Sequence, residues 1–145
     1  MKILLVEDDT LQAERIRELL EKRFRHVDVI RDEREFCSRL DELVANPPDV
    51  AVIDVMLPWG RYDPQHALPP REVQEGGYQR AGIRCVKRLL QREETRNITI
   101  IIYSMLERED LTRELEELPP QVCFLTKQAE LHELVESIYS SQKLH

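Results

Sequence analysis

The chain has few of the features that mark several common classes of protein. Its 145 residues include only three cysteines, widely spaced, so we expect free thiols in a reducing, cytoplasmic setting rather than a disulfide framework. The longest apolar run, Ile98–Tyr103, is far shorter than the ~18 residues of a membrane helix. The first residues, MKILLVEDD, become acidic too early for a signal peptide. The four glycines all lie between Pro58 and Gly82, beside four of the eight prolines.

Basic residues are also outnumbered. Lys and Arg total 21 against 28 Asp and Glu, which gives a net charge of −7. Phosphate backbones and anionic lipids attract clusters of Lys and Arg, so we expect no direct DNA binding and no membrane association. The hydrophobic share of 41% is ordinary for a globular protein, and the length suffices for one domain with a core.

Short apolar runs alternate with amphipathic segments along the chain. The runs that predict strands are Lys2–Glu7, Val27–Ile30, Val50–Val55, Thr99–Tyr103 and Val122–Leu125. Helical patterns fill the intervals at Leu11–Phe24, 32–44, Ile83–Leu90, Leu106–Leu118 and Ala129–Ser140. This alternation predicts an α/β three-layer sandwich with a five-stranded parallel sheet. Two strand orders are common in such folds, and periodicity does not choose between them.

Two helix starts carry capping signals. Thr10 is a plausible N-cap for the first helix. Asp32 precedes Glu35 by three residues, the spacing of a capping box, at the start of the second helix.

Polar residues gather where the predicted strands end. The acidic sequence 7–9 ends the first strand, Asp54 lies near the end of the third, Ser104 ends the fourth and Lys127 follows the fifth. In a parallel sheet these ends meet at the edge where ligands bind. Taken singly, each residue suits an ordinary helix cap or a solvated surface position. Together they predict a functional site.

The residue types at this edge indicate a particular chemistry. Clustered carboxylates repel one another unless a cation or a proton offsets them, and oxygen-only ligands suit a hard cation such as Mg²⁺. Asp54 is a candidate nucleophile, because carboxylates form aspartyl-phosphate intermediates. Lys127 and Ser104 could then hold the phosphoryl oxygens.

Four segments, MKILLVEDD, VIDVMLP, IIYS and FLTK, together resemble a response regulator receiver domain of the CheY-like class. The resemblance covers essentially the whole chain and implies a single receiver domain over residues 1–145 with strand order 2-1-3-4-5. It implies a phosphoacceptor in a two-component phosphorelay, with at most slow self-catalysed phosphorylation and dephosphorylation rather than an enzyme activity.

The resemblance also assigns roles to individual residues. Asp54 matches the phosphoacceptor, and Asp8 and Asp9 match the acidic pair that binds Mg²⁺ directly or through water. Asp54 is itself a metal ligand in this arrangement, and Met56 matches the position whose backbone carbonyl completes the set.

Three further residues match the switching apparatus of the family. Ser104 matches the hydroxyl residue that binds the phosphoryl group, Lys127 the lysine that pairs with it, and Phe124 the aromatic switch. The implied partners are a histidine kinase or a histidine phosphotransfer protein, and a downstream protein target. A homodimer through the face formed by residues 106–118, 122–125 and 129–140 also fits the resemblance.

The chain departs from the family pattern at three places. Gln128 follows Lys127 where proline is usual. Met105 follows Ser104 where a small residue is usual, and its longer side chain predicts restricted access to Asp54. The glycine expected eight residues after the phosphoacceptor corresponds to Gly82, 28 positions after Asp54, so about 20 residues form an inserted loop at about 59–82. That loop is either a tolerated surface loop or a lid or docking surface beside the site.

Other functions remain as alternatives. A haloacid-dehalogenase-like phosphatase needs a second carboxylate two residues after the nucleophile, where Met56 stands. In a flavodoxin-like FMN site, the acids at 7–9 would repel the phosphate. The closest rival is a pseudo-receiver that is not phosphorylated and acts as a protein-interaction module.

The four histidines and three cysteines show no metal-ligand spacing with one another, so the sequence predicts no metal site built from these residues.

Overall fold

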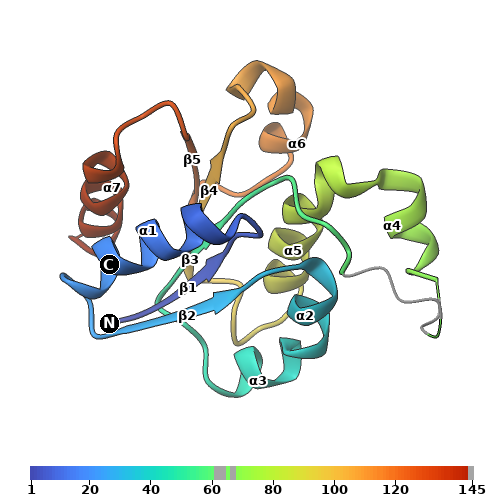
Figure 1. Ribbon diagram of the computed structural model, residues 1–145, viewed down its shortest axis with the longest axis horizontal. Coiled ribbons are helices and arrows are strands. Elements are labelled where there is room, and N and C mark those ends of the chain that lie inside the picture. Colours follow the sequence, from blue (N-terminus) through green and yellow to red (C-terminus); the bar gives the residue numbers. More distant parts are fainter. Residues whose placement is uncertain (61–64, 66–67, 144–145) are drawn as a thin grey trace.

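A five-stranded parallel sheet organises the chain in a computed structural model that describes residues 1–60, 65 and 68–143 (Figure 1). The strands lie in the order β2-β1-β3-β4-β5. Their bounds are β1 Lys2–Val6, β2 His26–Ile30, β3 Val50–Ile53, β4 Thr99–Ser104 and β5 Val122–Thr126. The predicted α/β class, the five strands and the order 2-1-3-4-5 are therefore confirmed.

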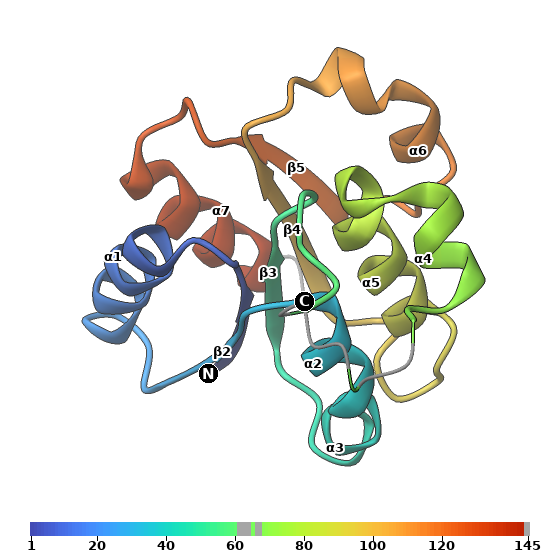
Figure 2. The same ribbon diagram turned by 45° about the vertical axis from the view of Figure 1, so that its right-hand side comes forward.

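Helices cover both faces of the sheet (Figures 1 and 2). One face carries α1 (Thr10–Glu21) and α7 (Leu131–Lys143). The other carries α2 (Glu33–Ser38), α3 (Leu40–Ala45), α5 (Ala81–Leu90) and α6 (Thr112–Glu116), with the 3₁₀ turn η2 (Arg108–Leu111) before α6. None of the described helices is long and apolar enough to cross a membrane.

The strands are apolar on both faces because each face has its own core. Leu4 and Val6 of β1 pack in the cluster that includes α5, whereas Ile3 and Leu5 pack in the cluster that includes α1 and α7. All four residues of β3 are buried. Burial on both faces is typical of parallel strands flanked by helices, and it fixes the register in which the strand ends align.

Several local predictions need correction. Asp9, not Thr10, caps α1: its Oδ1 accepts a hydrogen bond of 3.0 Å from Gln12 N. The predicted helix over 32–44 is two helices, α2 and α3, separated at Arg39. Asp32 does cap α2, through a 2.7 Å bond from Glu35 N, but Glu35 Oε1 accepts from Arg31 N rather than from Asp32. The predicted helix over 106–118 is η2 followed by α6.

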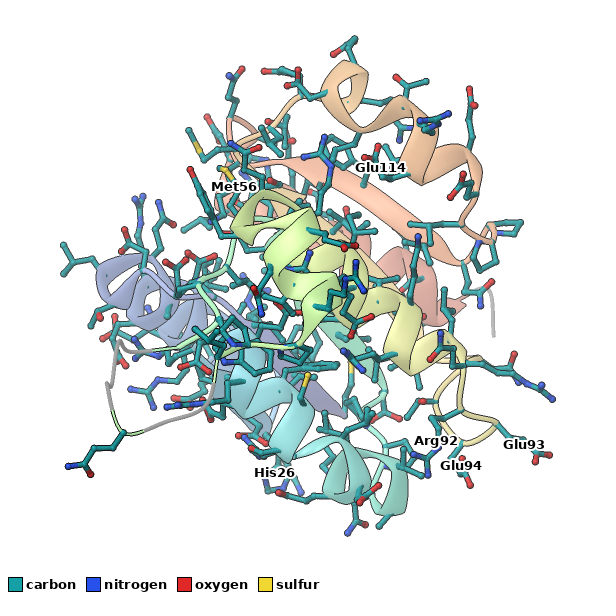
Figure 3. All side chains as sticks on the ribbon, turned by 90° about the vertical axis from the view of Figure 1, so that its right-hand side faces the viewer. His26, Met56, Arg92, Glu93, Glu94 and Glu114 are labelled. Atoms are coloured by element: carbon teal, nitrogen blue, oxygen red, sulfur yellow. The ribbon has the colours of Figure 1, made fainter. Side chains whose placement is uncertain are left out.

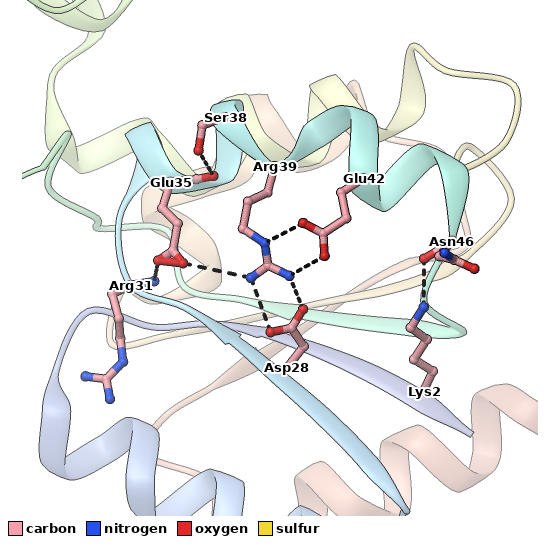
Figure 4. A network of polar contacts seen from close by, with 8 residues as sticks. All are labelled: Lys2, Asp28, Arg31, Glu35, Ser38, Arg39, Glu42 and Asn46. Carbon is pink, nitrogen blue, oxygen red and sulfur yellow. Dashed lines mark hydrogen bonds and ion pairs between the residues drawn. The ribbon is translucent and has the colours of Figure 1, made fainter.

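Arg39, at the break between α2 and α3, links both helices to strand β2 through ion pairs (Figure 4). Its guanidinium pairs with Asp28 of β2 and with Glu42 of α3, and lies 3.8 Å from Glu35 of α2. The hydrogen bonds that Arg39 donates to the carboxylates of Asp28 and Glu42 raise the pKa of its guanidinium.

The segment 59–82 is partly helical, although the sequence predicts an irregular loop there. It contains α4 (Arg71–Gly76) and the 3₁₀ turn η1 (Tyr78–Arg80), and it leads into α5. Its residues 61–64 and 66–67 lie outside the described part of the chain. Figure 1 shows α4 on the outer side of α5, where Glu72 pairs with Arg88 and Val73 is buried. Leu57 N also donates a 3.1 Å hydrogen bond to Tyr78 O.

Candidate functional site

The ends of β1 and β3 bring three carboxylates together. Val6 and Ile53 are partners in register, so Glu7 and Asp54, which follow them, emerge side by side. Asp54 N donates a 3.0 Å hydrogen bond to Val6 O, which holds this alignment past the last strand residue. Carboxylate oxygens of Glu7, Asp8 and Asp54 all lie within 4.8 Å of one another.

Lys127 from the loop after β5 is the cation of this cluster. Its Nζ lies 2.7 Å from Glu7 Oε2 and 3.0 Å from Asp54 Oδ2, and all three side chains are almost fully buried. Lys127 N donates to Ser104 O at 2.7 Å, so the backbone of β4 positions the lysine. Burial lowers the pKa of Lys127, but the charges of Asp54 and Glu7 outweigh it and the net shift is upward.

Three carboxylates around one ammonium leave an excess of negative charge. Burial and repulsion from Asp54 raise the pKa of Glu7 to about 7, although Lys127 opposes them. The same two causes raise the pKa of Asp8. Asp54 Oδ1 is buried and has no hydrogen-bond partner among the described residues. Burying a carboxylate oxygen without a hydrogen-bond partner is energetically costly.

The donor set suits a hard divalent cation. Glu7, Asp8 and Asp54 offer only oxygen ligands, which Mg²⁺ prefers over nitrogen and sulfur, and the cation would offset the charge that raises the pKa of Glu7.

The structure brings together Asp8 and Asp54 of the predicted metal ligands, but not Asp9. The carboxylate of Asp9 caps α1, and Glu7 stands in the cluster instead. The sequence placed Glu7 with Asp8 and Asp9 at the end of the first strand, but the family resemblance assigned the metal to Asp8 and Asp9. The signal that could have found Glu7 is the parallel register, in which the residue after Val6 stands beside the residue after Ile53.

A cavity of about 510 Å³ opens above the carboxylates. It is lined by Glu7, Asp8, Asp9, Gln12, Asp54, Met56, Leu57, Pro58, Tyr78, Met105 and Lys127. Met56, labelled in Figure 3, lies at the wall of this cavity, and so does Met105. Tyr78 comes from the 59–82 segment, which places part of that segment beside the site.

Ser104 and Phe124 lie near the site but do not line the cavity. Ser104 is fully buried, and its Oγ accepts a 3.2 Å hydrogen bond from Leu106 N in the following loop. Phe124, on β5, is half-buried, and the guanidinium of Arg108 lies over its ring at 5.5 Å. Both side chains are thus engaged elsewhere than at Asp54.

The 59–82 segment also reaches α6. Arg80 Nε lies 2.7 Å from Glu114 Oε1, and Arg80 Nη2 donates to Asp110 O at 3.3 Å. Figure 3 labels Glu114 on α6. The segment therefore bridges the cavity wall at Tyr78 and the helix that follows β4.

Comparisons with known proteins bear on the fold. No family model matches the sequence, and a search of curated proteins finds no match. Among solved structures, the Francisella response regulator 1452 receiver domain is 24% identical, with a TM-score of 0.68 over 98% of this chain and 96% of that one. The phosphorylated cyanobacterial phytochrome response regulator RcpA is 22% identical, with a TM-score of 0.65 over 94% and 87%.

A third structure extends the likeness to the full length. The N-terminal domain of a response regulator/sensory box/GGDEF protein from Carboxydothermus hydrogenoformans is 16% identical, with a TM-score of 0.71 over 99% of this chain and 95% of that one. Strand order, parallel pairing and coverage agree with these structures. The chain therefore has the fold of CheY-like response regulator receiver domains.

Proposed function

We propose that this protein is a phosphoacceptor receiver of a two-component phosphorelay, with Asp54 as the acceptor. The observation that carries the proposal is the state of the Asp54 carboxylate. Its Oδ2 is held by Lys127, whereas its buried Oδ1 has no hydrogen-bond partner among the described residues and belongs to a residue that lines the open cavity. A carboxylate held by one oxygen and free at the other is prepared to act as a nucleophile.

In the transfer step, Asp54 Oδ1 forms a bond to phosphorus while the bond between phosphorus and the donor breaks. The donor is a phosphohistidine of a histidine kinase or of a histidine phosphotransfer protein, and the leaving imidazole keeps the electron pair. Lys127 Nζ lies 3.0 Å from Asp54 Oδ2, so the ammonium stands ready to donate to a phosphoryl oxygen.

We propose Mg²⁺ as the cofactor. Glu7, Asp8 and Asp54 would hold it through carboxylate oxygens, and Met56 through its backbone carbonyl. The cation would supply charge neutralisation to the phosphoryl oxygens. Asp9, the other residue that the resemblance implies, is engaged as the cap of α1, so Glu7 takes its place in this proposal.

The output of the proposed reaction is a change of shape. A dianionic group on Asp54 would attract the Ser104 hydroxyl away from Leu106 N, and the loop after β4 would move with it. Phe124 would then leave its position under Arg108 and turn inward. The face formed by α6, β5 and α7 would present the result to a downstream protein target or to a second copy in a homodimer. The setting of such a relay is the cytoplasm.

The direct experiment is phosphorylation with acetyl phosphate and Mg²⁺, followed by intact mass and peptide mapping. We expect one added phosphoryl group, located on Asp54 and lost in Asp54→Asn. Asp41→Asn is the matched control, because Asp41 is 97% exposed on α3 and far from the cluster in sequence. Absence of any modification would favour the alternative, a pseudo-receiver that acts only as a protein-interaction module.

A further inference from the structure

Tyr78 stands at the mouth of the cavity that contains Asp54. Of the described residues in the 59–82 segment, it alone lines this cavity. Tyr78 is 59% exposed, so much of this large aromatic residue faces solvent at the cavity. Met105, from the loop after β4, also lines the cavity and is 54% exposed. The charged floor therefore has two large apolar side chains at its opening.

The backbone of Tyr78 is fixed on both sides. Leu57 N, three residues after Asp54, donates to Tyr78 O at 3.1 Å. Gly77 has a positive φ of 73°, a conformation that glycine adopts without strain, and this turn between α4 and η1 directs the chain toward the site. Arg84 Nη2 donates to Gly77 O at 2.8 Å.

The anchor of this turn is itself rigid. The Arg84 guanidinium that binds Gly77 O also makes two hydrogen bonds of 2.8 Å to the fully buried carboxylate of Glu33. On the other side of Tyr78, Arg80 pairs with Glu114. These contacts hold the backbone on both sides of Tyr78. The position of its ring at the cavity is therefore set by tertiary contacts rather than by a loosely held loop.

From these contacts we infer that the ring of Tyr78 shields a phosphoryl group on Asp54 from water and so lengthens the life of the phosphorylated state. This inference rests on the proposed function. In hydrolysis, a water oxygen forms a bond to phosphorus while the bond from phosphorus to the Asp54 oxygen breaks. The carboxylate leaves with the electron pair, and the water protons pass to phosphate and solvent. A ring over the cavity mouth lowers the frequency with which water reaches phosphorus in line.

The test measures how fast the acyl phosphate is lost. Wild type, Tyr78→Ala, Tyr78→Phe and Gln79→Ala are phosphorylated with acetyl phosphate and Mg²⁺ and freed of the donor, and the phosphorylated fraction is then followed by intact mass. We expect Tyr78→Ala to shorten the half-life on the order of threefold to tenfold, and Tyr78→Phe to keep it, because the ring is the shield. Gln79→Ala is the matched control: Gln79 is exposed, adjacent in sequence and absent from the cavity wall.

The outcomes separate the inference from the proposed function. If wild type takes up no phosphoryl group, the proposed function fails. If wild type is modified and Tyr78→Ala loses phosphate at the wild-type rate, only the inference fails. A half-life in Tyr78→Phe as short as in Tyr78→Ala would assign the effect to the hydroxyl and also overturn the shield. Thermal unfolding checks that each variant is folded. If Tyr78→Ala is not folded, the test is repeated with Tyr78→Gln, whose side chain is long but has no ring.

Discussion

Gly82, at the start of α5, lies directly against the backbone of Asp54. Gly82 N donates a 2.8 Å hydrogen bond to Val55 O, and a Cβ atom on Gly82 would overlap Asp54 O and lie 2.6 Å from Val55 Cα. Only a residue without a side chain allows this approach, so the glycine determines how closely α5 packs against the backbone of Asp54.

Gly82→Ala tests this support. In an ordinary helix the change would stabilise by about 1 kcal/mol. Here we expect a loss of about 2 kcal/mol in the free energy of unfolding, because the new methyl group must displace backbone rather than a flexible side chain. Urea unfolding measures it. Gly60→Ala is the control, because the nearest atoms there belong to the side chain of Arg34, and it should change stability little. A stabilised Gly82→Ala protein would contradict the close approach.

The buried pair of Glu33 and Arg84 is a second structural determinant. Glu33 is fully buried and the Arg84 side chain is 13% exposed, so each charge depends on the other. We expect Arg84→Met to lower the free energy of unfolding by about 3 kcal/mol, because it leaves an unpaired buried carboxylate. The double variant Arg84→Met, Glu33→Gln should recover much of that loss.

A matched exposed pair serves as the comparison for that experiment. Arg71 and Glu75 form an ion pair on α4 with side chains 91% and 66% exposed. Arg71→Met should therefore leave the unfolding curve almost unchanged, since exposed pairs contribute little. Equal losses in the Arg84 and Arg71 variants would show that burial of the Glu33 pair does not matter to stability.

The raised pKa of Glu7 predicts a pH dependence of stability in the absence of divalent cations. The folded pKa is about 7 and the ordinary value is 4.5, so between these values the folded state holds a proton that the unfolded state has lost. The free energy of unfolding should therefore fall as pH rises through this window, by about 1–2 kcal/mol between about pH 5.5 and 8.

Glu7→Gln isolates this contribution. Glutamine keeps an acceptor for Lys127 but does not titrate, so the decline with pH should be smaller by that amount in Glu7→Gln than in wild type. Urea unfolding in excess chelator at the two pH values, with both proteins, measures the difference. Equal slopes would show that Glu7 titrates at its ordinary pKa in the folded state.

The cluster geometry also predicts which acids hold a divalent cation. Mn²⁺ serves as a probe for the Mg²⁺ site, and the loss of the free Mn²⁺ signal in electron paramagnetic resonance reports binding. We expect Glu7→Gln, Asp8→Asn and Asp54→Asn each to weaken binding on the order of tenfold or more, and Asp9→Asn to weaken it far less. A larger effect for Asp9→Asn than for Glu7→Gln would restore the ligand set implied by the family resemblance.

The sequence by itself determined the class of the fold. Five short apolar runs, each bounded by helical patterns, require strands buried on both faces, and such strands pair in parallel. Asp54, Lys127 and Ser104 could be placed at one edge because they stand at strand ends, and strand ends are visible as the points where apolar runs stop. The family motifs supplied the strand order, which periodicity leaves open.

Only the tertiary structure decided which neighbours those residues have. The identity of the third carboxylate depends on the register of β1 against β3, which places Glu7, and not Asp9 two residues later, beside Asp54. The helical turns of the 59–82 segment could not be predicted from the local sequence pattern, because α4 and η1 are short. Contacts from α5 and α6, such as those of Arg84 and Glu114, hold them in place. Elements too short to be stable alone depend on tertiary contacts, so their sequences carry little signal of their own.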